Sequence, residues 1–230
     1  MKRVKGYLLA LIVCLGMFAF TACAEQKSDA FEMYQAAMQA TVKSGSWTED
    51  LTMTADMALE SGGTKVKATI DFNSLVDVSN YSESDPSAVR MSGSASMSVM
   101  GQTYAWNIEY ENGIAHYEYT EPMQTSADIE MDPSCYNFDT LTADMLENAK
   151  VSGNQISFTI PGAEMETARV AAMDMMSGFE DLEYGDVDVK ITIDESTGAI
   201  DAIIMTFHAS LTYMGYDAEV DYSIDYRFAA

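Results

Sequence analysis

The sequence contains few of the residues on which many activities depend. Its 230 residues include 12 Lys and Arg, 2 His, 3 Cys and 4 Pro. So few basic residues exclude a nucleic-acid-binding surface, because such a surface needs positive charge to meet the phosphates. No H-x-x-x-H, C-x-x-C, G-x-S-x-G or P-loop motif occurs, and His116 and His208 lie far apart in the sequence. We therefore expect no enzyme and no cofactor, although a pair of carboxylates brought together in space is one catalytic arrangement that the sequence leaves open.

Acidic residues and methionine are abundant instead. The chain has 36 Asp and Glu, a formal net charge of −24, 18 Met and 48% hydrophobic residues. A hydrophobic content this high argues against a disordered acidic tail, which lacks the apolar residues needed for a core. The function has to account for strong acidity and abundant methionine together.

The first residues form a targeting segment, which we assign to 1–22. Lys2, Arg3 and Lys5 give it a basic start, and an apolar run follows that has the length of a secretory signal. The run ends at Cys23, preceded by small residues, and this resembles the bacterial lipobox, in which the cysteine receives a diacylglycerol. An ordinary signal peptide that happens to contain a cysteine is the alternative. We expect a protein anchored to the cell membrane by lipid on Cys23, on the extracytoplasmic face, with residues 23–28 as its tether.

The cysteines and charges agree with this processing. Cys14 leaves with the signal and Cys23 is acylated, so Cys135 alone remains and no intrachain disulfide forms. Loss of the signal's three basic residues leaves 9 basic and 36 acidic residues, a net charge of −27. The folded part must therefore rely on a hydrophobic core, for which it is long enough.

Residues 29–230 are expected to form a single domain. Asp29 is the expected N-cap of a first helix, which Gly45 ends. From Trp47 onward, apolar and polar residues alternate over several segments separated by tight turns, which is typical of antiparallel strands. Two further helices are expected, one beginning after Asp139 and one over 163–177.

The fold class that follows is α+β. Strict alternation predicts a sheet with one buried and one solvated face, and a large apolar face must be covered. We therefore expect a large curved antiparallel β-sheet, a half-barrel, with the helices covering its apolar face.

The order of these segments resembles a known architecture. The chain is similar to the LolA/LppX-like superfamily of bacterial lipoproteins and lipid carriers. The similarity lies in the order of a lipobox, a tether, an amphipathic helix, long antiparallel strands, a helix–strand–helix insert and a final meander containing the Asp194-x-x-Thr197-Gly198 turn. The resemblance covers about residues 29–228 and rests on architecture, since no short motif is diagnostic. It implies an apolar cavity between a curved sheet and a helical lid, in which some members carry acyl chains. It implies no catalytic residues.

Methionine on the apolar faces of strands and helices supplies the candidate site. Methionine is flexible and polarizable, so it suits a surface that must accept variable apolar shapes, although it also fills irregular cores. Seven residues are candidates for lining a ligand cavity: Met53, Met57, Met97, Trp106, Met165, Met176 and Met205. An aromatic series on neighbouring strands either lines a groove or simply packs across the strands: Tyr104, Trp106, Tyr110, Tyr117 and Tyr119.

The acidic residues point to a solvated surface. Asp217, Glu219 and Asp221 alternate, so their side chains lie about 7 Å apart along one strand face, too far to surround one Ca²⁺ without help from loops. We expect no metal site.

Two functions are therefore carried forward. The first is a membrane-anchored lipoprotein that binds or carries a lipid, such as an acyl chain, or another apolar ligand between sheet and helices. The alternative is a cell-surface structural or interaction module with a filled core and no small-molecule ligand.

Overall fold

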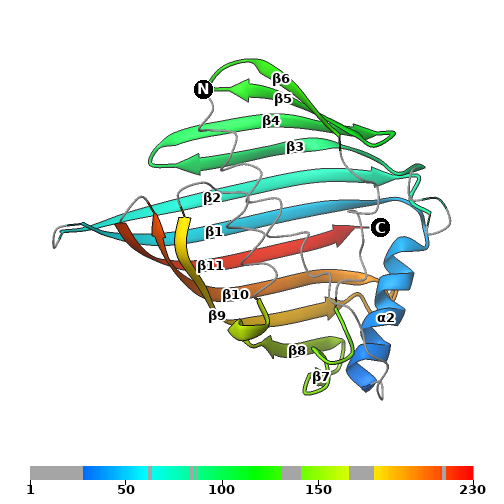
Figure 1. Cartoon of the computed structure of the whole chain (residues 1–230). Coiled ribbons are helices and arrows are strands. Elements are labelled where there is room, and N and C mark those ends of the chain that lie inside the picture. Colours follow the sequence, from blue (N-terminus) through cyan, green and yellow to red (C-terminus); the bar gives the residue numbers. More distant parts are fainter. Residues whose placement is uncertain are drawn as a thin grey trace.

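The protein is built on one large antiparallel sheet (Figure 1). A computed structural model describes residues 28–61, 64–82, 85, 88–130, 141–165, 179–213 and 216–229. In these residues it shows one α-helix, one 3₁₀ helix and 11 strands, all in a single sheet. The α-helix, α2, spans Asp29–Val42, and the 3₁₀ helix, η3, spans Gly162–Met165.

The strands are long near the centre of the sheet and short at its edges. Their bounds are β1 Trp47–Ser61, β2 Thr64–Ser79, β3 Arg90–Val99, β4 Gln102–Glu111, β5 Ile114–Glu121, β6 Thr125–Glu130, β7 Lys150–Ser152, β8 Gln155–Ile160, β9 Phe179–Ile193, β10 Ile200–Tyr213 and β11 Tyr216–Ala229.

The strand order is β6-β5-β4-β3-β2-β1-β11-β10-β9-β8-β7. Each pair of neighbours is antiparallel, and the first strand pairs with the last at the centre, with Met53 opposite Ile224. The sheet stays open, because β6 and β7 form its two edges and do not pair with each other. Figure 1 shows the strands fanning from β6 at one edge to β7 at the other.

Alternation along the strands separates an apolar face from a polar one, as the sequence predicts. On β1, Leu51, Met53 and Ala55 are buried, whereas Thr52 and Asp56, in the alternate register, are exposed. The apolar side chains of this face form a main core cluster that extends across the sheet and includes residues of α2. Val66, near the β1–β2 turn, is an exception to the predicted burial and is 47% exposed.

Helix α2 begins one residue earlier than predicted. Its N-cap is Ser28, whose Oγ accepts a hydrogen bond from the backbone N–H of Phe31 at 3.2 Å, so the prediction of Asp29 as the cap is wrong. Both residue types are good N-caps, and the preceding serine takes the role here. Gly45, with φ of +68°, follows the end of the helix as expected, and its N–H donates to Val42 C=O at 3.0 Å.

The predicted α+β class, with several helices covering the sheet, is wrong. Residues 143–148 form turns rather than the helix expected after Asp139, with bonds such as Leu146 N–H to Ala143 C=O spanning three residues. The expected helix over 163–177 is a short 3₁₀ turn up to Met165, and its remainder lies outside the described residues. The described chain is therefore almost entirely sheet, and α2 packs against β10 and β7 near one end of it (Figure 1).

Candidate functional site

Three of the predicted methionines lie in one line across the apolar face of the sheet. Pairing places Met53 opposite Ile224 on one side and opposite Phe72 on the other. Met205 lies opposite Ile224, and Met97 lies opposite Phe72. Extended by the next partners, this line, which we call the methionine row, contains Phe158, Val189, Met205, Ile224, Met53, Phe72, Met97 and Tyr104.

The fourth predicted residue, Trp106, lies in the adjacent line on the same face. It is opposite Ala95 on β3 and opposite Tyr119 on β5. The line, which we call the tryptophan row, contains Ile156, Ile191, Ile203, Tyr226, Leu51, Ser74, Ala95, Trp106 and Tyr119. Positions two residues apart on a strand share a face and lie about 7 Å apart, so the two rows form one continuous apolar surface.

The other predicted residues separate from these rows. Met165 is buried in the same main cluster but comes from η3 rather than from the sheet. Met57 packs against a second, smaller cluster around Val220 at the other end of the strands. Met176 lies outside the described residues. The structure thus brings together five of the seven predicted residues in one cluster, four of them on the sheet face.

Trp106 is the largest fully buried side chain of this surface. It is 1% exposed, and the rings of Phe72 and Tyr119 lie 6.0 and 6.3 Å from it, both tilted by 39°. Its indole Nε1 has no hydrogen-bond partner among the described residues. Buried polar groups are nearly always hydrogen-bonded, so this donor is exceptional.

Trp47, the second tryptophan, shows the usual arrangement. Its Nε1 donates to Oε1 of Glu49 at 2.8 Å, and both side chains are buried, at 4% and 9% exposure. Tyr226, diagonally opposite on β11, also donates to Glu49, and its burial, followed by the charge of Glu49, raises its pKa well above the ordinary value. The ring of Tyr81 lies edge-on to Trp47 at 5.3 Å.

Sequence reasoning missed this buried carboxylate, although a signal for it exists. Glu49 occupies the same alternating register as Trp47, Leu51 and Met53, so a charged residue falls on the apolar face of β1. A buried carboxylate needs hydrogen-bond donors. Trp47, two residues away in the same register, supplies one through its indole N–H.

The opposite face of the sheet carries paired polar side chains. Thr54 donates to Asp71 at 3.3 Å and Thr159 donates to Asp188 at 2.7 Å, each across a pair of neighbouring strands. Such cross-strand bonds confirm that much of the acidity lies on the solvated face. In the part of the chain that the structure describes, no group of three or more His, Cys, Asp or Glu is arranged to hold a metal ion.

Both histidines lie on this polar face, paired with carboxylates. His208 contacts Asp221 through Nδ1 at 2.9 Å and Glu219 through Nε2 at 2.6 Å, and these two carboxylates raise its pKa. His116 contacts Asp128 at 2.5 Å, which raises its pKa as well. Both ring nitrogens of His208 and Nδ1 of His116 meet carboxylates, so both histidines are members of surface ion pairs.

Two hollows occur at β3–β5, away from the methionine row. They have volumes of about 410 and 360 Å³, and both include Ser92, Glu109 and His116. None of the predicted lining residues that the structure describes belongs to either one. Most of the residues around both hollows are polar or charged.

Comparisons with known proteins leave the family open. Neither the scan against protein-family models nor the search of curated proteins gives a match. Among solved structures, the ywiB protein from Bacillus subtilis is similar over 86% of this chain and 99% of its own, with 8% identity and a TM-score of 0.24. A TM-score this low carries no argument about fold or function. Among the helices that the structure describes, none combines the length and the apolar character that a membrane span requires.

Proposed function

We propose that the protein binds a lipid or another apolar ligand on the apolar face of its sheet. The observation that carries the proposal is the methionine row, with Met53, Met97 and Met205 in register across the sheet and Trp106 in the row beside them. Unbranched methionine side chains change shape at little cost, so such a row can accommodate different hydrocarbon chains. The LolA/LppX-like resemblance belongs to the same proposal.

The second part of the proposal concerns location. Diacylglycerol on Cys23 would hold the protein at the extracytoplasmic face of the cell membrane, which suits the exchange of a lipid ligand with that membrane. Cys23 lies outside the described residues, so the support comes from the sequence alone. Growth with a clickable fatty acid tests it: wild type becomes labelled, and labelling of Cys23→Ser at the wild-type level would contradict it.

Native mass spectrometry tests ligand binding directly. Delipidated Cys23→Ser protein is offered a bacterial lipid extract, and we expect a bound apolar species that survives transfer to the gas phase. Repeated absence of any bound species would exclude the proposed function.

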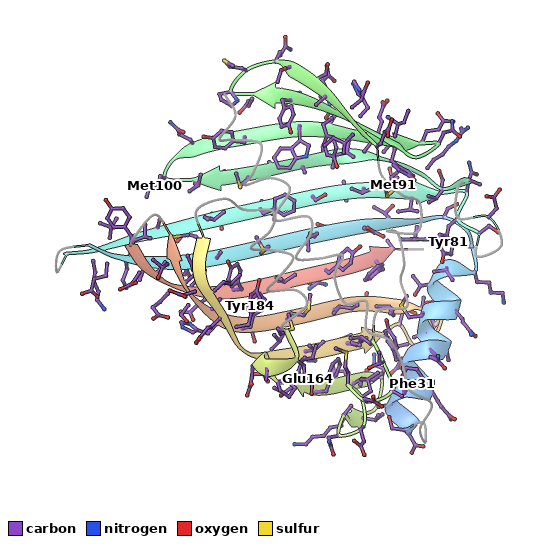
Figure 2. All side chains as sticks on the ribbon, in the orientation of Figure 1. Phe31, Tyr81, Met91, Met100, Glu164 and Tyr184 are labelled. Atoms are coloured by element: carbon purple, nitrogen blue, oxygen red, sulfur yellow. The ribbon has the colours of Figure 1, made fainter. Side chains whose placement is uncertain are left out.

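A methionine variant connects binding to the row. Met53, Met97 and Met205 are replaced together by Leu, which conserves volume but is stiffer, so we expect a folded protein that accepts a narrower range of chain lengths. Met100 and Met123, which are 67% and 59% exposed, provide the matched control when replaced by Leu. Met100 lies at the tip of the β3–β4 hairpin and is not a member of the row (Figure 2).

The alternative, an interaction module with a filled core, is favoured by a different observation. The hollows at β3–β5 are lined mostly by polar residues and the predicted residues on the sheet face are buried, so binding could occur on the outer, acidic face instead. A partner for that face would be basic. Under this alternative, the mass spectrum shows no apolar ligand and the methionine variant behaves as the control does.

A further inference from the structure

The strongest unexplained feature of the apolar face is the indole N–H of Trp106. The side chain is 1% exposed, and its Nε1 has no hydrogen-bond partner among the described residues. A buried donor without an acceptor destabilises the folded protein, because the N–H loses its water and gains nothing in return. An acceptor supplied from outside the chain would remove that cost.

On the side of β3 and β2, the side chains that neighbour Trp106 along its row are small. Moving along the tryptophan row from Trp106, the next two positions are Ala95 and Ser74, before Leu51 is reached. In the methionine row, the same two strands carry Met97 and Phe72 instead. The side chains next to Trp106 on this side of its row are therefore smaller than those at the matching positions one row away.

The charges of the buried face restrict what kind of acceptor fits. Among the described residues, the buried polar or charged ones are Thr41 and Glu49, so no Lys or Arg is buried there. A carboxylate or phosphate placed on this face would lack a counter-charge and would lose its hydration. A neutral carbonyl oxygen has no such requirement and accepts a hydrogen bond from an indole N–H.

We propose that the apolar ligand is an acyl ester whose carbonyl oxygen accepts the hydrogen bond of Trp106 Nε1, with its hydrocarbon chain on the methionine row. This inference rests on the proposed function and adds the chemical class of the ligand. It distinguishes a neutral acyl ester from a bare hydrocarbon, which has no acceptor, and from a free fatty-acid anion, which brings a charge.

Three probes separate these classes. Methyl palmitate, octadecane and palmitate have similar chain lengths, and each is delivered from cyclodextrin to delipidated Cys23→Ser protein at neutral pH. We expect methyl palmitate to bind about threefold to tenfold more tightly than octadecane, the gain typical of one net hydrogen bond. Palmitate anion should bind more weakly than the ester.

The two tryptophans provide matched variants. Trp106→Phe removes the donor, so the preference for methyl palmitate over octadecane should disappear while octadecane binding is retained. Trp47→Phe removes an indole whose N–H already donates to Glu49. That control should keep the preference of the wild type.

A spectroscopic measurement decides the matter if Trp106→Phe does not fold. In Trp47→Phe, Trp106 is the only tryptophan, because the chain has 2 Trp. Hydrogen bonding at the indole N–H moves its absorption to longer wavelength, so methyl palmitate should produce a red shift that octadecane does not.

The outcomes separate the two proposals. If none of the probes binds wild-type protein, the proposed function fails. If octadecane binds as tightly as methyl palmitate, if Trp106→Phe keeps the ester preference, or if the two probes give the same spectrum, the inference about the ester is wrong and apolar binding still stands.

Discussion

The two ends of the buried face treat their polar groups differently. At the end reached by α2, which we call the helix region, buried donors and acceptors meet partners within the chain. Thr41 Oγ1 donates to Ala37 C=O and accepts from the backbone N–H of Ile200, both at 2.9 Å, and Trp47 donates to Glu49. At the β3–β5 end, Trp106 is equally enclosed, but its N–H has no partner among the described residues.

This difference is what the proposed ligand site at Trp106 predicts. In the helix region, the hydrogen bond from Ile200 N–H to Thr41 links the start of β10 to α2, so a buried polar contact joins segments distant in sequence. Figure 2 shows Phe31 on α2, beside the lower strands of the sheet. The tryptophan row carries a buried donor that meets no acceptor among the described residues, and in our proposal this donor recognises the ligand.

The largest expected effect is the difference in stability between the same substitution made at each of the two tryptophans. Phe at either position loses similar volume, but Trp47→Phe also removes a hydrogen bond to a buried carboxylate. We expect Trp47→Phe to lower the free energy of unfolding by about 1.5–3 kcal/mol more than Trp106→Phe in ligand-free protein. Urea unfolding followed by circular dichroism measures the difference, and equal losses would contradict the contrast between the two ends.

A second substitution removes the bond between the helix and the sheet. Thr41→Val conserves shape but leaves the buried N–H of Ile200 without its acceptor, so we expect a loss of about 1–3 kcal/mol in unfolding free energy. The control is Thr52→Val, because Thr52 is exposed and its bond to Asn73 is long, at 3.3 Å. That control should stay within about 0.5 kcal/mol of wild type. A small effect of Thr41→Val would mean that the helix region does not depend on this contact.

The smallest expected effect lies on the polar face, outside both regions. Asp221 and Glu219 raise the pKa of His208 above 6.5, so the folded protein favours its protonated form. Its contribution to stability is complete below the unfolded pKa and is lost as pH rises through the raised pKa of the folded state.

Thermal unfolding at about pH 5.5 and about pH 9 measures this contribution. Between these two pH values, the Tm of His208→Gln should fall less than the Tm of wild type. The difference should be small, because the charged pair is exposed and screened by solvent. His116→Gln, which removes a single pairing with Asp128, should differ from wild type even less. An unchanged or larger decrease in His208→Gln would contradict the assignment.

Much of the fold could be predicted because alternation is a local property. The period of two in segments such as 47–59 and 216–228 correctly predicted strands and, through them, which side chains are buried. The helix expected after Asp139 was wrong because apolar residues four apart, such as Leu141 and Met145, also fit a chain of turns. A short segment without strong caps does not distinguish the two.

The candidate site could be predicted only as a set of residue types. Met53 and Met205 were predicted to face the interior, but their place in one row depends on the pairing of β1 with β11 and of β11 with β10. That register is set by contacts between distant segments, which no local pattern records. The missing partner of Trp106 depends on the whole packed surface for the same reason.

The order of the strands has a consequence for how the sheet can be assembled. The first and last strands are neighbours at its centre, with Thr48 opposite Ala229, while β6 and β7, which follow one another along the chain, form its opposite edges. The two halves of the sheet can each form as local meanders, but they join only when the final strand arrives. Contacts between residues so distant in sequence are slow to form. The central seam between β1 and β11 would therefore close only after the two halves of the sheet have formed.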